Sequence, residues 1–167
     1  MAVNNNLRKA QVRGDASAGV VAPALRLRPL EDSLSISLLR AREAVMAHFR
    51  PQLLEQDLSE QQWRVIRALA ESGEVDAGTV AQNSCIHPAS FSRILRSLQK
   101  RKILRTTPSR TDSRRLLVEL APGGRELFDK MAPVSESIYR RLEEKLGREL
   151  IADTLQMVKK ISGNLRD

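Results

Sequence analysis

Apolar side chains recur at three- to four-residue steps over most of the chain beyond residue 33, which is the spacing of helices that bury one face. The first such run covers residues 34–54, where we expect a helix that Pro51 kinks or thins near its end. A short helix is predicted at 77–85. Another begins at Pro88, a residue suited to a first helical turn, and runs to about Arg101.

Between these helices the sequence carries a well-formed helix start at LSEQQW, residues 58–63. Ser59 is placed to cap the helix and Gln62 to reach back to it, which together make a capping box. Leu58 precedes the cap and is expected to pack onto Trp63 as a hydrophobic staple. The helix should end at Gly73, since glycine readily adopts the left-handed conformation of a helix end.

The spacing changes after Lys102. Residues 103–107 and 116–120 are rich in β-branched and aliphatic side chains and are predicted to form two short strands. The polar, basic segment 108–114 between them is predicted to form the turn of a hairpin with a charged tip.

Helical spacing returns at Gly124 and continues to the end of the chain. Gly147 divides this part into a long helix, which we expect to bend at Pro133, and a final helix. Their apolar stripes exceed what a small domain needs to cover; the stripe residues are Leu127, Met131, Val134, Ile138, Leu142, Leu146, Ile151, Leu155, Val158 and Leu165.

The helix that begins at Pro88 has two opposite faces. Its apolar residues fall on one side, which should be buried: Phe91, Ile94, Leu95 and Leu98. Small and basic residues fall on the other side or in the first turn: Ala89, Ser90, Ser92, Arg93, Arg96, Ser97 and Lys100. Such a face suits the DNA major groove, because arginine donates bidentate hydrogen bonds to guanine while serines and first-turn amides reach phosphates.

The net charge of the chain is +8, and its location is informative. Residues 91–115 contain nine arginines and lysines against one acid, Asp112, so that this segment alone accounts for the whole net charge. A charge confined to one segment favours an anionic partner. Arg110 and Arg114 at the hairpin tip are expected to reach a neighbouring groove or the backbone. Asp112 is expected to orient an arginine or to cap the turn, because it would repel phosphate.

Composition narrows the function classes further. The content of aromatic residues is only 3%, which argues against a base-stacking platform for single strands. We expect no enzyme, because the two histidines have no nucleophile, base and acid grouping around them, and no metal site or cofactor-binding motif is evident. No apolar run is long enough for a membrane span, and the single cysteine fits a reducing cytoplasm. Residues 1–30 are expected to be a disordered basic tail that either touches DNA phosphates or is inert.

Three motifs make the sequence resemble the MarR-type regulators: LSEQQW at 58–63, PASFSR at 88–93 and DSR at 112–114. The resemblance spans residue 34 to the C-terminus. Within the family, residues 32–54 and 57–69 are most similar to regulators of homoprotocatechuate-degradation operons. Three positions depart from the family pattern: Lys102 replaces a glycine after the second helix, Ser113 replaces a wing arginine, and Ala121 replaces a threonine that caps the next helix.

The resemblance implies a fold and an assembly. The fold is mainly α with a small β-hairpin wing, that is, a winged helix-turn-helix with long N- and C-terminal dimerisation helices. Residues 57–122 would form the DNA-binding lobe, and residues 31–56 and 123–167 the dimerisation helices. The homodimer would read a pseudo-palindromic operator in double-stranded DNA with two equivalent helices.

The resemblance also implies a repressor of an aromatic-compound catabolic operon that a small aromatic acid or its coenzyme A thioester releases. Arg40, Arg42, His48, Trp63 and Arg67 are the candidate effector-binding residues, since arginine pairs with carboxylates and tryptophan stacks on rings. Each also has a structural interpretation: the arginines as bridges to acids on a neighbouring helix, the tryptophan as a core staple and the histidine as a surface or partly buried residue.

Two alternatives remain open at this point. A redox-sensing repressor would need a reactive Cys85, but the end of a helix disfavours a thiolate and Ile86 beside it has a core character, so we expect a packed thiol. A nonspecific architectural nucleic-acid binder is compatible with composition alone. The amphipathic helix followed by a basic hairpin favours the sequence-specific DNA regulator.

Overall fold

The computed structural model describes residues 28–112 and 115–165 of the 167-residue chain, which divides into two units, 1–37 and 38–167. The described part of the first unit holds a short 3-10 helix, Leu30–Asp32, and the start of helix α1, Leu34–Met46. The basic tail expected at 1–30 lies outside the described residues except for its last three.

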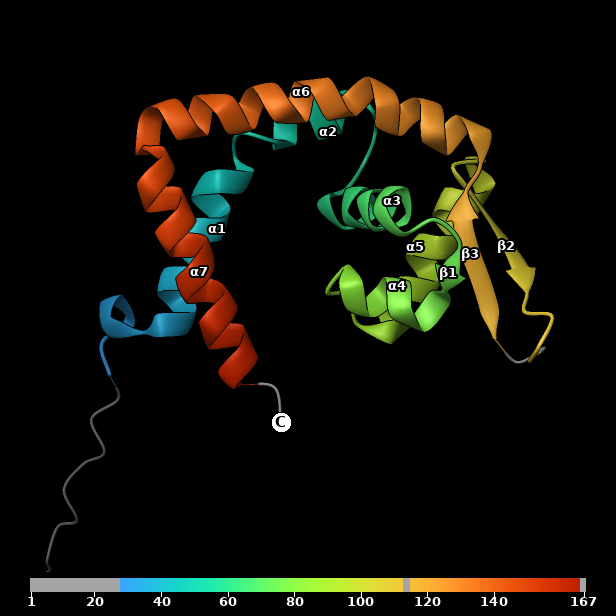
Figure 1. Cartoon of the computed structure of the whole chain (residues 1–167), viewed down its shortest axis with the longest axis horizontal. Coiled ribbons are helices and arrows are strands. Elements are labelled where there is room, and N and C mark those ends of the chain that lie inside the picture. Colours follow the sequence, from blue (N-terminus) through green and yellow to red (C-terminus); the bar gives the residue numbers. More distant parts are fainter. Residues whose placement is uncertain (1–27, 113–114, 166–167) are drawn as a thin grey trace, which may run out of the picture. The chain divides into compact units, whose positions relative to one another are not determined.

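The second unit is mainly helical with one small antiparallel sheet, as the sequence predicts (Figure 1). Along the chain its elements after α1 are α2 (Arg50–Glu55), α3 (Glu60–Ser72), β1 (Val75–Asp76), α4 (Ala77–Asn83), α5 (Pro88–Lys100), β2 (Leu104–Pro108), β3 (Leu116–Leu120), α6 (Pro122–Leu146) and α7 (Arg148–Asn164). The strand β1, only two residues long, is the element that the sequence analysis did not anticipate.

The predicted helix at 34–54 is in fact two helices, because the chain leaves the helical path between Met46 and Arg50. Pro51 lies in the first turn of α2, where its missing N–H is not required. Phe49 at this break is buried and packs with Ile138 and Leu142 of α6. The proline therefore begins a new helix rather than kinking an existing one, and the expected single helix is wrong.

The start of α3 matches the prediction in atomic detail. The N–H of Gln62 donates to the Ser59 hydroxyl at 3.1 Å, and the N–H of Ser59 donates to Gln62 Oε1 at 2.8 Å. Leu58 and Trp63 are both buried in the same core. Gly73 ends the helix with φ +71°, and its N–H donates to the carbonyl of Leu69.

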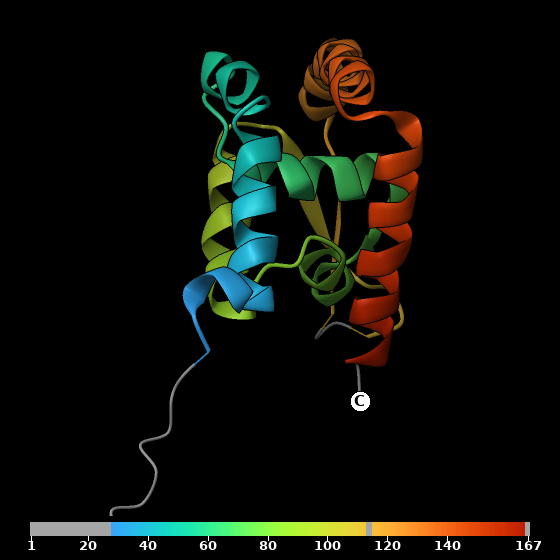
Figure 2. The same ribbon diagram turned by 90° about the vertical axis from the view of Figure 1, so that its left-hand side faces the viewer.

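The core of this unit lies where α3, α4 and α5 meet, covered by β3 and α6 (Figures 1 and 2). β3 is the central strand of the sheet, with β1 on one side and β2 on the other. Val118 of β3 pairs with both Val75 and Thr106 and is fully buried. The other largest fully buried side chains are Leu53, Val65, Ile66, Leu69, Val80 and Leu98.

The long helix α6 passes through Pro133 without ending there. Met131, Ile138 and Leu142 of its stripe are buried. The amide Nε2 of Gln52 on α2 donates to the Ser135 hydroxyl on α6 at 2.8 Å, and both side chains are buried.

Helices α1 and α7 bury none of their residues within the described chain. On α7 four large apolar side chains are exposed, from 38% at Val158 to 63% at Met157, whereas Ile151 and Ile161 are half-buried. An exposed apolar face of this extent favours contact with another chain.

Gly124 marks the closest approach of α6 to the strand region. A Cβ at this position would lie 1.9 Å from the carbonyl oxygen of Ile103, which is backbone and has little freedom to move. Glycine is thus required at position 124 by packing.

We expect Gly124→Ala to lower the free energy of unfolding by about 1–3 kcal/mol or more, because the methyl group overlaps a backbone carbonyl. Gly163→Ala on α7 is the matched control: its Cβ would meet nothing within 4 Å, and alanine should raise stability by up to about 1 kcal/mol. Urea denaturation followed by circular dichroism measures both. Equal stabilities for Gly124→Ala and the parent protein would contradict the packing argument.

Candidate nucleic-acid interface

Helix α5 begins with a side-chain cap and a proline. His87 Nδ1 accepts a hydrogen bond from the N–H of Ala89 at 3.3 Å, and Pro88 occupies the first turn. The four residues predicted to form its dry face are all buried: Phe91, Ile94, Leu95 and Leu98. Burial of this face fixes which side of the helix meets solvent.

The opposite side of α5 is exposed along its length. Six of the seven predicted DNA contacts on this helix are exposed, namely Ala89, Ser90, Ser92, Arg93, Arg96 and Lys100. The guanidinium of Arg96 donates only to the carbonyl of Ser92, one turn earlier on the same helix. The structure therefore brings these residues together on one solvent-facing surface.

Ser97 differs from the others because it is half-buried. Its hydroxyl accepts a hydrogen bond at 3.2 Å from Nε2 of Gln62, the residue that also completes the capping box of α3. Ser97 thus joins α5 to the start of α3. The sequence pattern placed it near the DNA face but gave no sign of this partner, which lies 35 residues away.

The C-terminal end of α5 is also anchored. The guanidinium of Arg101 donates to the carbonyls of Asp57 and Gln56, at 2.5 and 2.9 Å, so this basic residue serves the fold. Lys102 has φ +56°, a left-handed conformation that glycine adopts more easily. The departure from the family pattern at this position is therefore accommodated by strain at a single residue.

The strands β2 and β3 form the predicted hairpin, visible beside β1 in Figure 1. Arg105 and Glu119 face each other across it, with Nε donating to the carboxylate at 2.7 Å. That hydrogen bond and the carboxylate charge raise the pKa of Arg105. Arg110 at the tip is exposed, and the Asp112 carbonyl accepts from the N–H of Arg115 at 2.9 Å.

Arg114, the second predicted contact of the hairpin, lies outside the described residues together with Ser113. At the start of α6, Ala121 occupies the cap position and offers no side-chain hydrogen bond, as its departure from the family pattern implies.

An ion pair between Asp76 and Arg115 joins the tip end of the hairpin, directly before β3, to the start of α4. One carboxylate oxygen of Asp76 caps α4, accepting from the N–H groups of Gly78 at 2.9 Å and Thr79 at 3.3 Å. The other accepts from Arg115 Nε at 3.2 Å. Partial desolvation raises the pKa of Asp76, but the hydrogen bonds from Arg115 and the two amides outweigh it, and the pKa lies below its ordinary value.

The five candidate effector residues are not gathered into one site. Arg40 and His48 are exposed. Trp63 is buried and its ring stacks on that of Phe128, with centroids 6.0 Å apart, so it serves the core. Arg67 is exposed, and its guanidinium donates to the Tyr139 hydroxyl at 3.4 Å.

Arg42 belongs to a four-membered ion network. Arg42 and Arg50 each pair with both Glu43 and Glu60, which ties α1 and α2 to the first turn of α3. Desolvation raises the pKa of Glu60, but the two arginines lower it by more, and the net shift is downward. The interpretation of Arg42 as a bridge to an acid on a neighbouring helix therefore matches its contacts.

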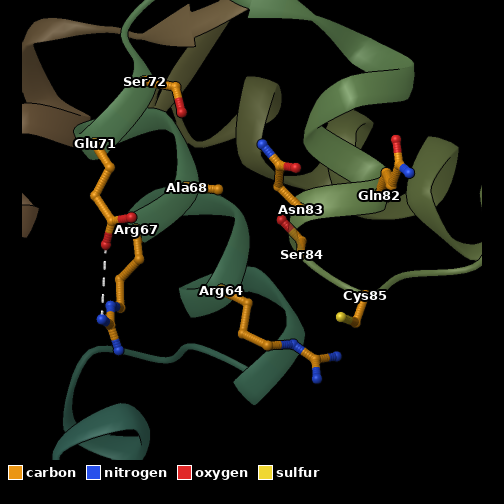
Figure 3. Close-up of a pocket in the computed structure, with 9 residues that line it drawn as sticks. All are labelled: Arg64, Arg67, Ala68, Glu71, Ser72, Gln82, Asn83, Ser84 and Cys85. Atoms are coloured by element: carbon orange, nitrogen blue, oxygen red, sulfur yellow. Dashed lines mark ion pairs between the residues drawn. The ribbon is translucent and has the colours of Figure 1, made fainter. Parts of the chain in front are cut away.

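Arg67 also lines a cavity of about 570 Å³ between α3 and α4 (Figure 3). Arg64 and Glu71 of α3 and Ser84 and Cys85 after α4 share this cavity. Of the residues that line this cavity, the sequence analysis named only Arg67 as an effector contact and Cys85 as a redox candidate, because a cavity between two helices leaves no periodic signal in either one.

Cys85 is exposed, so the expected packed thiol is wrong. The chain turns sharply out of α4 here, with φ +50° at Cys85, which sends its side chain outward while Ile86 is buried. Across residues 28–112 and 115–165 there is no cluster of three or more potential metal ligands. Within the same ranges no helix is both long and apolar enough to cross a membrane.

Two packed helices, α4 and α5, followed by a basic hairpin, define a winged helix-turn-helix fold, in which α5 stands in the position of a recognition helix. The MarR family model matches residues 56–115, which contain the elements from α3 to β2 and the turn of the hairpin. The chain is 39% identical over 137 residues to the HTH-type transcriptional regulator FarR of Neisseria gonorrhoeae, covering 80% of this chain and 93% of that relative.

The homoprotocatechuate degradative operon repressor of Escherichia coli is 36% identical over 120 residues, covering 72% of this chain and 81% of the repressor. A crystal structure of NadR in complex with 4-hydroxyphenylacetate superposes with a TM-score of 0.71 at 32% identity, covering 82% of this chain and 97% of NadR. The chain belongs to the MarR family of transcriptional regulators, and it is a DNA-binding regulator rather than an enzyme.

The contributions of the Asp76–Arg115 ion pair and of the helix cap can be separated by two substitutions. Arg115→Gln removes the pair and keeps the cap, and Asp76→Ser keeps a capping oxygen but loses the charge. Because the pair is exposed, we expect less than about 1 kcal/mol loss of stability from either. Both should weaken DNA binding, measured by fluorescence anisotropy, through a less well-held wing.

Arg105→Gln is the control, since it breaks a pair between the two strands near the base of the hairpin, away from the contact with α4. Unchanged DNA affinity in both Arg115→Gln and Asp76→Ser would rule out a role of the pair in holding the wing.

Proposed function

We propose that the protein is a homodimeric, sequence-specific repressor of an aromatic-compound catabolic operon, and that an aromatic acid or its coenzyme A thioester releases it from DNA. The proposal of DNA binding rests on the exposed face of α5, where Arg93, Arg96 and Lys100 project opposite a buried apolar face. The proposal of an effector response is supported by the names of the relatives and by the exposed guanidinium of Arg67.

Arg93 is the best candidate for base readout. It lies in the second turn of α5, on the side opposite the core, and no described residue pairs with its guanidinium. An arginine so placed is free to donate two hydrogen bonds to a guanine in the major groove. The exposed first-turn residues Ala89, Ser90 and Ser92 would lie near phosphates, and Arg110 on the wing would contact a neighbouring part of the backbone.

Dimerisation is supported by the unpartnered apolar faces of α1 and α7. In this proposal residues 31–56 and 123–167 form the dimer interface and residues 57–122 the DNA-binding lobe. A two-fold dimer repeats its recognition helix, so the operator would be pseudo-palindromic with half-sites about one helical turn apart.

An acidic effector is supported by Arg67 and by the names of the relatives. The guanidinium of Arg67 lies beside the Tyr139 hydroxyl and is only loosely paired with Glu71, at 3.7 Å. A carboxylate would pair with it more closely, in bidentate fashion. NadR was solved with 4-hydroxyphenylacetate, and the E. coli relative is named for homoprotocatechuate degradation; both compounds are hydroxylated aromatic acids. Exposed Arg40 and His48 are available to complete such a site from a second chain.

Arg93→Ala tests the recognition helix. We expect it to cost about 1–3 kcal/mol on the cognate duplex, roughly 5- to 150-fold in affinity, and nothing on a scrambled duplex, so that sequence preference is lost while the dimer persists. Fluorescence anisotropy with DNA from upstream of the protein's own gene, at several salt concentrations, measures this.

Arg110→Ala is the comparison variant for Arg93→Ala. As a phosphate contact it should weaken binding to both duplexes evenly and reduce the salt slope by about one. Full discrimination between the duplexes by Arg93→Ala would show that α5 does not read the bases through this residue.

For the effector, the probe is 4-hydroxyphenylacetate, with 4-hydroxyphenylacetamide as a neutral control of the same shape. We expect the acid, and not the amide, to release the bound duplex in anisotropy, and Arg67→Gln to raise the required concentration at least about tenfold, since it removes a charge-assisted pair. The coenzyme A thioester of the same acid is tested in a parallel titration, because it represents the second proposed effector class. Release by acid and amide alike would contradict a carboxylate-reading site.

A further inference from the structure

The exposed face of α5 and the tip of the wing are held in place by different contacts. The apolar side of α5 is buried along the helix, whereas burial along β2 ends partway along the strand. Leu104 is buried, Thr106 is half-buried, and Thr107 and Pro108 are exposed. Hydrophobic packing therefore fixes the base of the hairpin, but it does not by itself fix where the tip lies relative to α5.

A polar contact joins the hairpin to α5 at the point where this packing ends. Gln99, in the last turn of α5, donates from Nε2 to the Thr106 hydroxyl on β2 at 2.7 Å, and both residues are half-buried. Thr106 pairs with Val118, the fully buried residue of the central strand, so its side chain shares the core side of the hairpin. The amide of Gln99 thus holds β2 at the edge of the core.

The position of this hydrogen bond gives it leverage over the wing tip. Counted from buried Leu104, Thr106 lies two residues along the chain and Arg110 lies six, which is about 7 Å and at most about 20 Å of extended chain. If the hairpin pivots at its buried base, a sideways shift of about 1 Å at Thr106 becomes roughly 3 Å at Arg110. That displacement is as long as a hydrogen bond, so a small loss of restraint at Thr106 would break a contact made at the tip.

We propose that Gln99 is a positioning residue for DNA binding, which sets the distance between the exposed face of α5 and the wing through its hydrogen bond to Thr106. This inference rests on the proposed function, in which α5 occupies the major groove and Arg110 contacts the neighbouring backbone. Both contacts form at once only when that distance matches the duplex. Gln99 precedes Lys100, so the last turn of α5 directs one residue to the groove and uses the other to hold the wing.

The test is a double-mutant cycle in the full-length protein, followed by fluorescence anisotropy with the cognate duplex from upstream of the protein's own gene and a scrambled duplex. Gln99→Met removes the amide but keeps a good helix former, and Thr106→Val exchanges the hydroxyl for a methyl group in a β-branched side chain. Each variant is combined with Arg110→Ala, the proposed wing contact, and separately with Arg93→Ala, the proposed base contact. Thr106→Ser retains the hydroxyl, and Gln61→Met makes the same change at an exposed glutamine on α3.

We expect Gln99→Met and Thr106→Val each to weaken binding to both duplexes about threefold, because a phosphate contact does not depend on base sequence. In either variant, Arg110→Ala should cause less than about half of the fold-loss that it causes in the parent protein, since a displaced wing has already lost this contact. The fold-loss caused by Arg93→Ala should not change. Thr106→Ser and Gln61→Met should bind as the parent protein does.

Equal fold-losses for Arg110→Ala in the parent protein and in both variants would overturn the proposal, because a bond that only stabilises the fold leaves the wing contact intact. An equally large change in the effect of Arg93→Ala would also overturn it, since the whole of α5 would then have moved. Failure of the proposed function is a separate result, in which the parent protein binds both duplexes equally. The cycle with Arg110→Ala on the scrambled duplex would still report on the wing.

Discussion

In the proposed function, the packing of the apolar face of α5 into the lobe core is the interaction on which DNA recognition depends. The buried face of α5 packs against α3 and the sheet and consists of Phe91, Ile94, Leu95 and Leu98. Helix geometry then fixes the direction in which the remaining side chains point. Arg93, Arg96 and Lys100 are therefore held outward by the burial of their neighbours. In the proposed function, the hydrophobic burial of one face of α5 thus positions the side chains that read DNA.

The two ends of α5 add polar restraints to that packing. His87 caps its first turn, and the Arg101 guanidinium holds the residue after its last turn to the carbonyls of residues 56 and 57. The Ser97–Gln62 hydrogen bond links its middle to the start of α3. In turn, Glu60 in the first turn of α3 joins the ion network with Arg42 and Arg50. Exposed ion pairs contribute little singly, but a network that shares its partners spreads the cost of ordering over several bonds.

The sequence was sufficient wherever structure follows from local spacing. The capping box of Ser59 and Gln62, the buried face of α5 and the strands of the wing all depend on residues a few positions apart, and all were predicted correctly. The bond from Gln62 to Ser97 and the pair of Asp76 with Arg115 join residues 35 and 39 positions apart. No periodicity records such contacts, because they depend on how the elements dock.

Two predictions were wrong, for different reasons. The break at Phe49 arises because its ring packs with Ile138 and Leu142, far along the chain, and Pro51 then suits the start of α2. Cys85 was expected to be packed because its neighbour is apolar, but the left-handed turn at Cys85 itself reverses the direction of its side chain. Of the candidate effector residues, Arg67 lines the cavity between α3 and α4. The positions of the others are set by tertiary or intermolecular neighbours, which the sequence pattern does not record.

The central claim is that two equivalent copies of α5 read one pseudo-palindromic site. Hydroxyl-radical footprinting of DNA from upstream of the protein's own gene tests this most directly. The account predicts two protected half-sites with centres about 10 base pairs apart, related by two-fold symmetry, and their loss with Arg93→Ala. Even protection along the whole fragment, unchanged in a scrambled sequence, would contradict it.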